Sequence, residues 1–169
     1  MHSRGVLSLF HLNGLACPSD NQLALQMARD SAAAGSRYGQ YAHARILQQG
    51  IGGGIGIDHV SAAAEYRLAA LQGLDAAQYE LGLMYLQDNG VQRDLACALH
   101  LFEQAASHEH PQAAYRIACM YEQGCSVAAD AAAAIVWYKK AAAGGSSEAC
   151  NALSAITVRE WHLRSGERI

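Results

Sequence analysis

Charged and aromatic residues are scarce in this chain of 169 residues, at 16% and 7% respectively, and it has only two prolines. A β-sandwich or barrel would need more aromatic and β-branched residues in its strands. Alanine, the best helix former, is instead abundant, and proline, the strongest helix breaker, is nearly absent. The composition therefore predicts one domain of closely packed helices.

Other absences exclude whole classes of function. A net charge of −3, with no basic segment, argues against nucleic-acid binding. The chain has no run of about eighteen apolar residues, so its sequence predicts no membrane-spanning helix. Residues 1–17 faintly resemble a secretory or lipoprotein leader, but His11 and Asn13 interrupt their apolar run. We therefore expect a cytoplasmic protein; a periplasmic or secreted location stays open if residues 1–17 are the remnant of a leader.

Motifs for catalysis and metal binding are missing as well. The chain has no Ser-x-x-Lys and no Gly-x-Ser-x-Gly, and His108-Glu109-His110 lacks the paired histidines of a zinc-protease helix. We predict no enzyme activity, no metal site and no cofactor. The five cysteines have no Cys-x-x-Cys spacing, so we interpret most of them as small buried residues, with a disulfide as the alternative. They are Cys17, Cys97, Cys119, Cys125 and Cys150.

What the chain does have is an internal repeat. The segment from Gly73 matches the segment from Glu109 without a gap, at an offset of 36 residues. The matched pairs include Tyr79 with Tyr115, Met84 with Met120, Asp94 with Asp130 and Phe102 with Tyr138. We divide one domain, 1–169, into a weak repeat at 1–34, full repeats at 35–72, 73–108 and 109–144, and a half repeat with a capping helix at 145–169.

Each repeat reads as helix, loop, helix. Asp58, Asp94 and Asp130 stand where an acidic side chain caps the second helix. We expect Tyr85, Phe102, Tyr121, Trp137 and Tyr138 to lie in the core. A single helix pair cannot bury both of its apolar faces, so neighbouring pairs must stack. The predicted fold class is all-α, a right-handed α/α superhelix of antiparallel helix pairs.

The glycine-rich stretch at 49–58, QGIGGGIGID, raises the question of a phosphate-binding loop. Its glycines never provide the spacing Gly-x-Gly-x-x-Gly, and it follows a predicted helix rather than a strand. Aligned with the loops DNGVQRD and GCSVAAD of the next two repeats, it is the same loop with two extra residues. We therefore predict a helix-to-helix turn and no nucleotide site.

The repeats also carry a family resemblance. The pattern A-x-A-Q-Y-x-L-G-x-M-Y-x-x-x-x-G-V-x-x-D, followed by A-x-x-x-F/Y-x-x-A-A, resembles the Sel1-like repeat, a relative of the tetratricopeptide repeat. The copy at 73–108 fits best, with Ala77-Gln78-Tyr79 and Leu81-Gly82, although Asp75 replaces a small residue. The resemblance implies a scaffold or adaptor for protein assemblies, often in bacterial signalling, secretion or host interaction, without catalytic residues.

The first helices of such repeats are expected to line a concave surface that binds a partner protein or peptide. Alternating charges at Arg45, Glu80 and Arg116 would suit a peptide of mixed charge. The stripe in the first full repeat also passes through Ala42. Simple solvation of these positions remains an alternative. The predicted partner-binding residues are Tyr38, Arg45, Gln49, Glu80, Leu83, Gln87, Gln112, Arg116 and Gln123.

Three further alternatives stay open. The chain would serve equally as a regulatory or immunity-type protein that occludes one effector. A less favoured reading is a His/Cys-based enzyme or a small-molecule-binding protein. The C-terminal segment VREWHLRSGERI leaves the repeat pattern. Its Trp161 caps the last apolar face, anchors a partner, or joins two copies into a homodimer through terminal helices.

Overall fold

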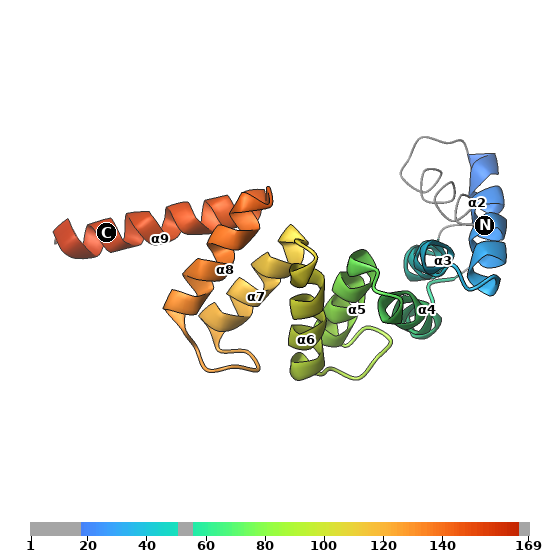
Figure 1. Ribbon diagram of the computed structural model, residues 1–169, viewed down its shortest axis with the longest axis horizontal. Coiled ribbons are helices and arrows are strands. Elements are labelled where there is room, and N and C mark those ends of the chain that lie inside the picture. The colour runs from blue at the N-terminus through green and yellow to red at the C-terminus, as the bar shows by residue number, and fades with distance from the viewer. Residues whose placement is uncertain (1–17, 51–55, 166–169) are drawn as a thin grey trace. The chain divides into compact units, whose positions relative to one another are not determined.

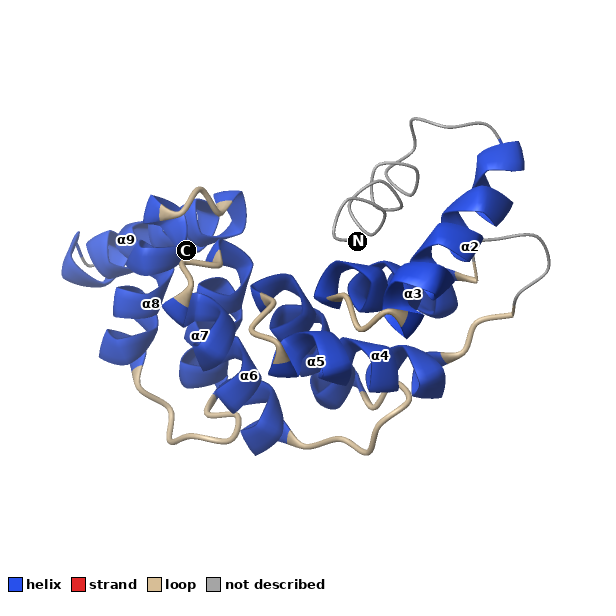
Figure 2. Ribbon diagram, turned by 45° about the vertical axis from the view of Figure 1, so that its right-hand side comes forward, coloured by secondary structure: helices blue, strands red, loops and turns tan. Residues whose placement is uncertain are grey.

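The structure, a computed structural model, describes residues 18–50 and 56–165. These residues form eight helices and no strand (Figures 1 and 2). This confirms the all-α class. The helices are α2 (Pro18–Ala33), α3 (Arg37–Gln49), α4 (His59–Leu71), α5 (Asp75–Gln87), α6 (Leu95–Ser107), α7 (Pro111–Gln123), α8 (Ala131–Ala143) and α9 (Ser147–Ser165).

The chain divides into two compact units, Met1–Leu101 and Phe102–Ile169, and the boundary falls inside α6. In the first unit α3 packs against α2 and α4, and α4 packs against α5. In the second unit α8 packs against α7 and α9. No helix of the described part is long and apolar enough to span a membrane.

The loop within each repeat closes in the same way. The first helices end at Gly50, Asp88 and Gly124, each with a left-handed backbone. After each loop an aspartate N–H donates back to a carbonyl of the first helix, in the pairs Asp58–Leu47 at 2.9 Å, Asp94–Tyr85 at 3.1 Å and Asp130–Tyr121 at 3.0 Å. The residues that flank the longer loop of the first full repeat are therefore joined by the same backbone hydrogen bond as those of the next two repeats. Of its predicted turn, residues 51–55 lie outside the described residues.

The predicted aspartate caps are confirmed. Asp58 accepts a hydrogen bond from the Ser61 N–H at 3.0 Å, and Asp130 accepts one from the Ala133 N–H at 3.0 Å. Asp94 accepts from the N–H groups of Ala96 and Cys97. Hydrogen bonds from Ser61 lower the pKa of Asp58, and those from Cys97 lower the pKa of Asp94, because they stabilise the carboxylate.

The turns between repeats form a second recurring motif. A residue with positive φ follows each second helix, and its N–H donates to the carbonyl three residues earlier. The next N–H donates to the carbonyl five residues earlier, which completes a Schellman-type C-cap. The positive-φ residue is glycine in three of the turns (Gly35, Gly73 and Gly145), and it is Glu109, with φ 62°, in the turn between α6 and α7.

One aromatic residue of each second helix anchors the core. In the first unit Tyr66 is fully buried, its ring centroid lies 5.6 Å from that of Tyr41, and its hydroxyl donates to Gln48 Oε1 at 2.7 Å. In the second unit the ring centroid of Tyr138 lies 5.7 Å from that of Tyr115, and the Tyr138 hydroxyl donates to Glu122 Oε2 at 2.6 Å. The middle repeat has apolar residues at both positions, Phe102 and Leu86.

The core predicted from the sequence is correct in part. Phe102 and Tyr138 are buried, but Tyr85, Tyr121 and Trp137 are only half-buried. Trp137 is partly exposed, and Lys140 Nζ lies over its ring, 4.9 Å from the centroid. Amphipathic aromatic rings of this kind bury their bodies while one edge or face stays at the surface.

The interpretation of the cysteines as mostly buried is wrong for those that the structure describes. Cys97 and Cys150 are exposed, Cys119 and Cys125 are half-buried, and all four are free thiols. Cys97 lies in the first turn of α6, where Asp94 caps the backbone and solvent covers the side chain. Cys17 lies outside the described residues.

Candidate functional site

The first-helix positions proposed for partner binding are accessible in both units. Tyr38, Arg45, Glu80, Leu83, Gln112 and Arg116 are half-buried, and Gln49, Gln87 and Gln123 are exposed. Positions that recur in every repeat, such as Ala44, Met84 and Ala118, are instead buried. Ala42 does not belong to the accessible stripe, because it is fully buried in a cluster with Ala28 of α2. The recurring small and apolar positions thus lie in the core, while the proposed partner-binding positions keep part of their surface accessible.

In the first unit, Arg37 holds the Tyr38 side chain. The Arg37 guanidinium lies 4.9 Å from the centroid of the Tyr38 ring, and its Nη2 donates to the Tyr38 hydroxyl at 3.1 Å. Arg37 Nη1 also donates to the Gln72 carbonyl at 3.4 Å. Tyr38 therefore presents a ring that is already oriented by a cation.

Charged side chains of α3 and α5 influence each other in the same unit. Burial raises the pKa of Glu80, and the positive charge of Arg45 opposes that effect. Burial and the Glu80 charge also raise the pKa of Tyr41, while Arg45 lowers it. The structure thus brings Arg45, Glu80 and Tyr41 into one electrostatic neighbourhood. Sequence reasoning missed Tyr41 here, because its recurrence as Tyr79 and Tyr115 was read only as a mark of the repeat.

A second polar pair of this unit had no signal in the sequence. His43 Nδ1 lies 3.1 Å from Glu65 Oε1, which joins α3 to α4. The two residues are 22 positions apart, and only the packing of the helices brings them together. The pair ties the first helix to the second, so we assign it a structural role.

In the second unit, the predicted residues lie on α7. Gln112 Nε2 donates to Glu148 Oε2 at 3.2 Å, and the Arg116 guanidinium lies 5.9 Å from the Tyr115 ring centroid. Arg116 Nε is buried and has no hydrogen-bond partner among the described residues. The hydrogen bond from its own backbone N–H, then those from Gln112 and Ser146, lower the pKa of Glu148 to about 2.

Two observations on the described residues concern the alternative of a His/Cys-based enzyme. No group of three or more His, Cys, Asp or Glu side chains there could hold a metal ion. Cys97 lines an open pocket of about 480 Å³ with Arg67 and Arg93, but its hydrogen bond with Asp94 raises the pKa of the thiol. A raised pKa leaves less thiolate, which is the reactive form.

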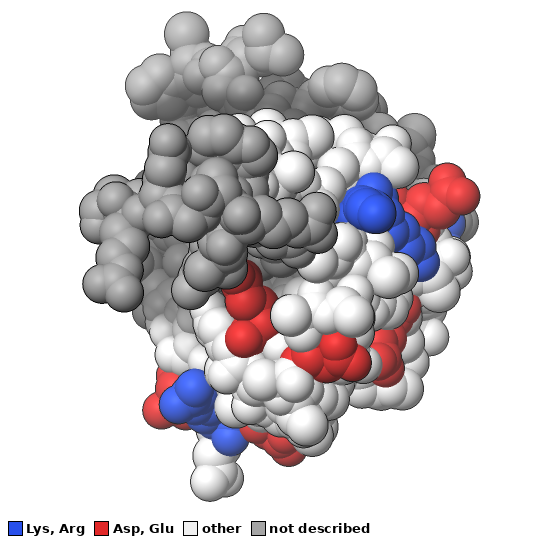
Figure 3. All heavy atoms as spheres, turned by 90° about the vertical axis from the view of Figure 1, so that its left-hand side faces the viewer, with Lys and Arg blue, Asp and Glu red and all other residues white. Residues whose placement is uncertain are grey.

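The net charge is −3, and one face of the molecule carries charges of both signs. Figure 3 shows one face, on which basic side chains lie beside acidic ones within a largely uncharged surface. A nucleic-acid site would instead need Lys and Arg gathered along one stripe. The mixed charges agree with the net charge of −3.

The helix pairs, the capped loops and the repeated turns define the class of the protein, an all-α protein of tandem helix-pair repeats. The Sel1 repeat model matches residues 5–36, 37–74, 75–110 and 111–146. The chain therefore belongs to the Sel1 repeat family, whose repeats commonly serve as non-enzymatic scaffolds for protein interactions. Comparison with curated proteins finds no match.

Solved structures of other Sel1 repeat proteins are similar to this chain. The protective antigen c5321 of uropathogenic Escherichia coli, which displays an SLR fold, is 28% identical with a TM-score of 0.82, and the match covers 93% of this chain and 33% of that one. A Sel1 repeat protein from Oxalobacter formigenes is 23% identical with a TM-score of 0.78, covering 87% and 59%. Cysteine rich protein B of Helicobacter pylori is 18% identical with a TM-score of 0.61, covering 82% and 98%.

The chain thus spans a third of the length of the Escherichia coli protein and 59% of the Oxalobacter protein. The two relatives below 25% identity establish the fold alone. Together these structures confirm the predicted class of an all-α superhelix of Sel1-like repeats.

Proposed function

We propose that this chain is a non-enzymatic scaffold whose first helices bind a partner peptide of mixed charge. One observation carries the proposal: variable polar and aromatic side chains of α3, α5 and α7 stay accessible, while recurring small and apolar positions of the same helices, such as Ala44, Met84 and Ala118, are buried. Buried recurring positions maintain the fold, so the accessible variable positions are free to differ with the partner.

The electrostatics of each unit support this role. In the first unit, Glu80 keeps a raised pKa because burial outweighs the stabilising charge of Arg45, so its carboxylate would gain from a cation on a partner. In the second unit, the Arg116 side chain is half-buried beside the Tyr115 ring, and the accessible part of its guanidinium would pair with a carboxylate on a partner. Each unit thus offers a charged side chain with which a side chain of opposite charge on a partner would pair.

Affinity capture from the native host tests the proposal. The triple variant Arg45→Ala, Glu80→Ala, Arg116→Ala should lose its partner, and circular dichroism should confirm that it remains helical. The matched control is Arg93→Ala, Glu103→Ala, Lys139→Ala, which removes the same charges from exposed positions outside the first helices. A partner that the triple variant retains undiminished would contradict the assignment of this surface.

The non-enzymatic part of the proposal has its own test. Isothermal titration of the pure chain with divalent metals and with nucleotides should show no tight stoichiometric binding. A tight one-to-one isotherm would favour the small-molecule-binding alternative.

We further propose a cytoplasmic location. The free thiols of Cys97, Cys119, Cys125 and Cys150 support it, because reducing compartments keep cysteines unpaired. Fractionation of the native host should recover the chain in the cytoplasm, and recovery from the periplasm or medium would contradict this location.

A further inference from the structure

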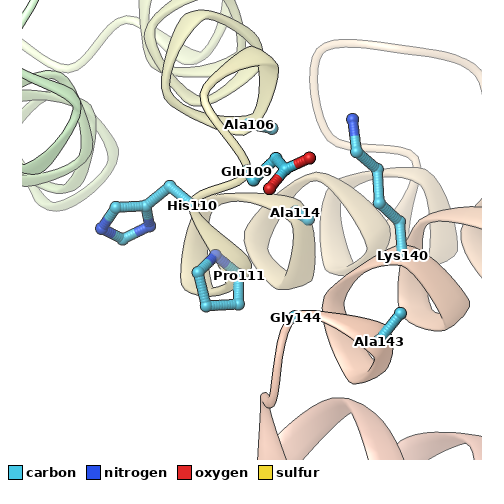
Figure 4. A pocket seen from close by; sticks show the side chains of 8 residues that line it. All are labelled: Ala106, Glu109, His110, Pro111, Ala114, Lys140, Ala143 and Gly144. Carbon is cyan, nitrogen blue, oxygen red and sulfur yellow. The ribbon is translucent and has the colours of Figure 1, made fainter.

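A pocket of about 360 Å³ lies in the second unit, where the turn between α6 and α7 faces α8. Figure 4 shows Glu109 extending from that turn and Lys140 from α8, on facing sides of the pocket, while the His110 ring points away. Small residues form the surface between the two charges. The lining residues are Ala106, Glu109, His110, Pro111, Ala114, Lys140, Ala143 and Gly144.

The pocket lies where the other full repeats place a glutamine. Ala114 aligns with Gln40 and Gln78, which are buried in the first unit. Gln78 Nε2 donates to the carbonyl of Ala70, in the last turn of the preceding helix, at 3.4 Å. Gln40 Oε1 accepts from Gln72 Nε2 at 2.8 Å, and that amide also donates to the Gly35 carbonyl at 3.2 Å. Each of these repeats thus fills the position with a carboxamide from the chain itself.

In the third full repeat, that carboxamide is missing and its acceptor remains. The Ala106 carbonyl aligns with that of Ala70 and accepts from the backbone N–H of Glu109 at 3.2 Å. A carbonyl oxygen has two lone pairs, so one stays available to a second donor. Because Ala114 has only a methyl group, no side chain at this position reaches the carbonyl as Gln78 does in its own repeat.

A second departure from the repeat occurs at the same place. Glu109 holds a left-handed backbone at φ 62°, where the other three turns have glycine. A residue with a side chain pays a conformational penalty there, and such outliers concentrate at functional sites. The strained position aims a carboxylate at the pocket, where glycine would leave the rim uncharged (Figure 4).

We propose that this pocket binds the carboxamide side chain of a glutamine residue that a partner peptide presents. A carboxamide has two N–H donors and one acceptor oxygen. The Ala106 carbonyl and the Glu109 carboxylate accept from the two N–H groups, and the Lys140 ammonium donates to the oxygen. The peptide's glutamine thus takes the place that Gln78 occupies in its own repeat. The statement that a partner peptide presents the glutamine rests on the proposed scaffold function, whereas the binding of a carboxamide in the pocket does not depend on it.

A blocked amino acid tests the pocket without any knowledge of the partner. N-acetyl-glutamine amide is titrated into the full chain carrying labelled alanine methyl groups, and binding is followed by NMR. We expect saturable shifts at Ala106, Ala114 and Ala143, with weak affinity for so small a probe. N-acetyl-leucine amide, which lacks the polar atoms, and N-acetyl-glutamate amide, which Glu109 repels, should bind at least tenfold more weakly.

Two variants and a control assign the binding to this pocket. Ala114→Gln restores the repeat pattern, fills the pocket and should abolish the saturable shifts, whereas Ala132→Gln, on an exposed position of α8, should leave them unchanged. Glu109→Gly removes one acceptor and should weaken binding about threefold to tenfold. Since glycine suits that turn, Glu109→Gly should fold, so it decides the question even if Ala114→Gln does not fold.

The outcomes separate this proposal from the scaffold function. No saturable shifts with blocked glutamine, equal binding of blocked leucine, or unchanged binding in Ala114→Gln or Glu109→Gly would overturn the pocket proposal. None of these results bears on the capture experiment with Arg45, Glu80 and Arg116, which lie on the first helices. Conversely, a partner retained by that triple variant would leave the blocked-glutamine titration intact.

Discussion

Replacing Glu109 with glycine should stabilise the chain, because this residue holds a left-handed backbone conformation that suits glycine. The four turns between repeats share one hydrogen-bond pattern, and Glu109 is the residue with positive φ in the third of them. The Glu109 N–H donates to the Ala106 carbonyl at 3.2 Å. The N–H groups of Gly35, Gly73 and Gly145 donate to the equivalent carbonyls at 2.8, 2.9 and 3.0 Å. Glycine can adopt this conformation without the penalty that a Cβ atom imposes.

The expected magnitude follows from two opposing effects. The left-handed conformation costs a residue with a side chain about 1–2 kcal/mol. Glycine loses about 0.5–1 kcal/mol more conformational entropy on folding. Glu109 also precedes α7, and losing its charge near that helix N-terminus costs about 0.3 kcal/mol. The net gain is therefore about 0.5 kcal/mol, which raises Tm by about 1–2 °C in a chain of this length.

Urea denaturation of Glu109→Gly and Glu109→Ala measures the effect. Comparing the two variants isolates the backbone, because both remove the carboxylate. Gly73→Ala is the reverse experiment, since a Cβ there would meet no atom within 4 Å and only the backbone strain at φ 75° is added. It should destabilise the chain by about 1 kcal/mol. The reasoning is refuted if Glu109→Gly is no more stable than Glu109→Ala, or if Gly73→Ala is neutral.

Three further predictions concern stability. Gly90→Ala should lower the free energy of unfolding by about 2 kcal/mol or more, because it combines left-handed strain at φ 68° with a clash between the new Cβ and the backbone of His59. If urea denaturation gives a loss no larger than that of Gly73→Ala, the clash is contradicted. Tyr66→Phe should lower the free energy of unfolding by about 1 kcal/mol, because it leaves Gln48 Oε1 unpaired. The double variant Tyr66→Phe, Gln48→Leu should recover most of this stability, since the middle repeat has the apolar pair Phe102 and Leu86 at these positions. No recovery in urea denaturation would argue against the hydroxyl pairing. The folded-state pKa of Glu148 is lowered from 4.5 to about 2, so its contribution to stability is complete above pH 4.5 and is lost as the pH falls toward 2. Thermal unfolding at pH 5 to 2 should therefore show a smaller pH dependence in Glu148→Gln, and identical profiles would refute the assignment.

Much of the fold could be predicted because its signals are local. The recurrence of Tyr79 as Tyr115 and of Asp94 as Asp130 marks the repeat, and a cap requires only an aspartate a few residues before the N–H groups that it accepts from. The same locality is why the glycine-rich loop is predicted to be a turn. Aligning it with the loops of the next two repeats required no knowledge of the tertiary packing.

The exposure of individual side chains could not be predicted with the same success. Ala42 was placed on the accessible stripe, yet α2 covers it, and Cys97 and Cys150 were interpreted as buried, yet they are exposed. Burial depends on which neighbouring element covers a position, and one sequence does not contain that information. The partner-binding residues remain a prediction for the same reason, since their role depends on a molecule outside the chain.

The sequence by itself determined the repeat, the helix pairs and the caps, because these depend on residues close together along the chain. Only the tertiary structure decided how distant residues meet. It placed Arg45 where its charge acts on Glu80, and it joined His43 to Glu65. It also left a pocket beside Ala114, because a glutamine missing from one repeat becomes a cavity only where α8 and the preceding turn enclose the position.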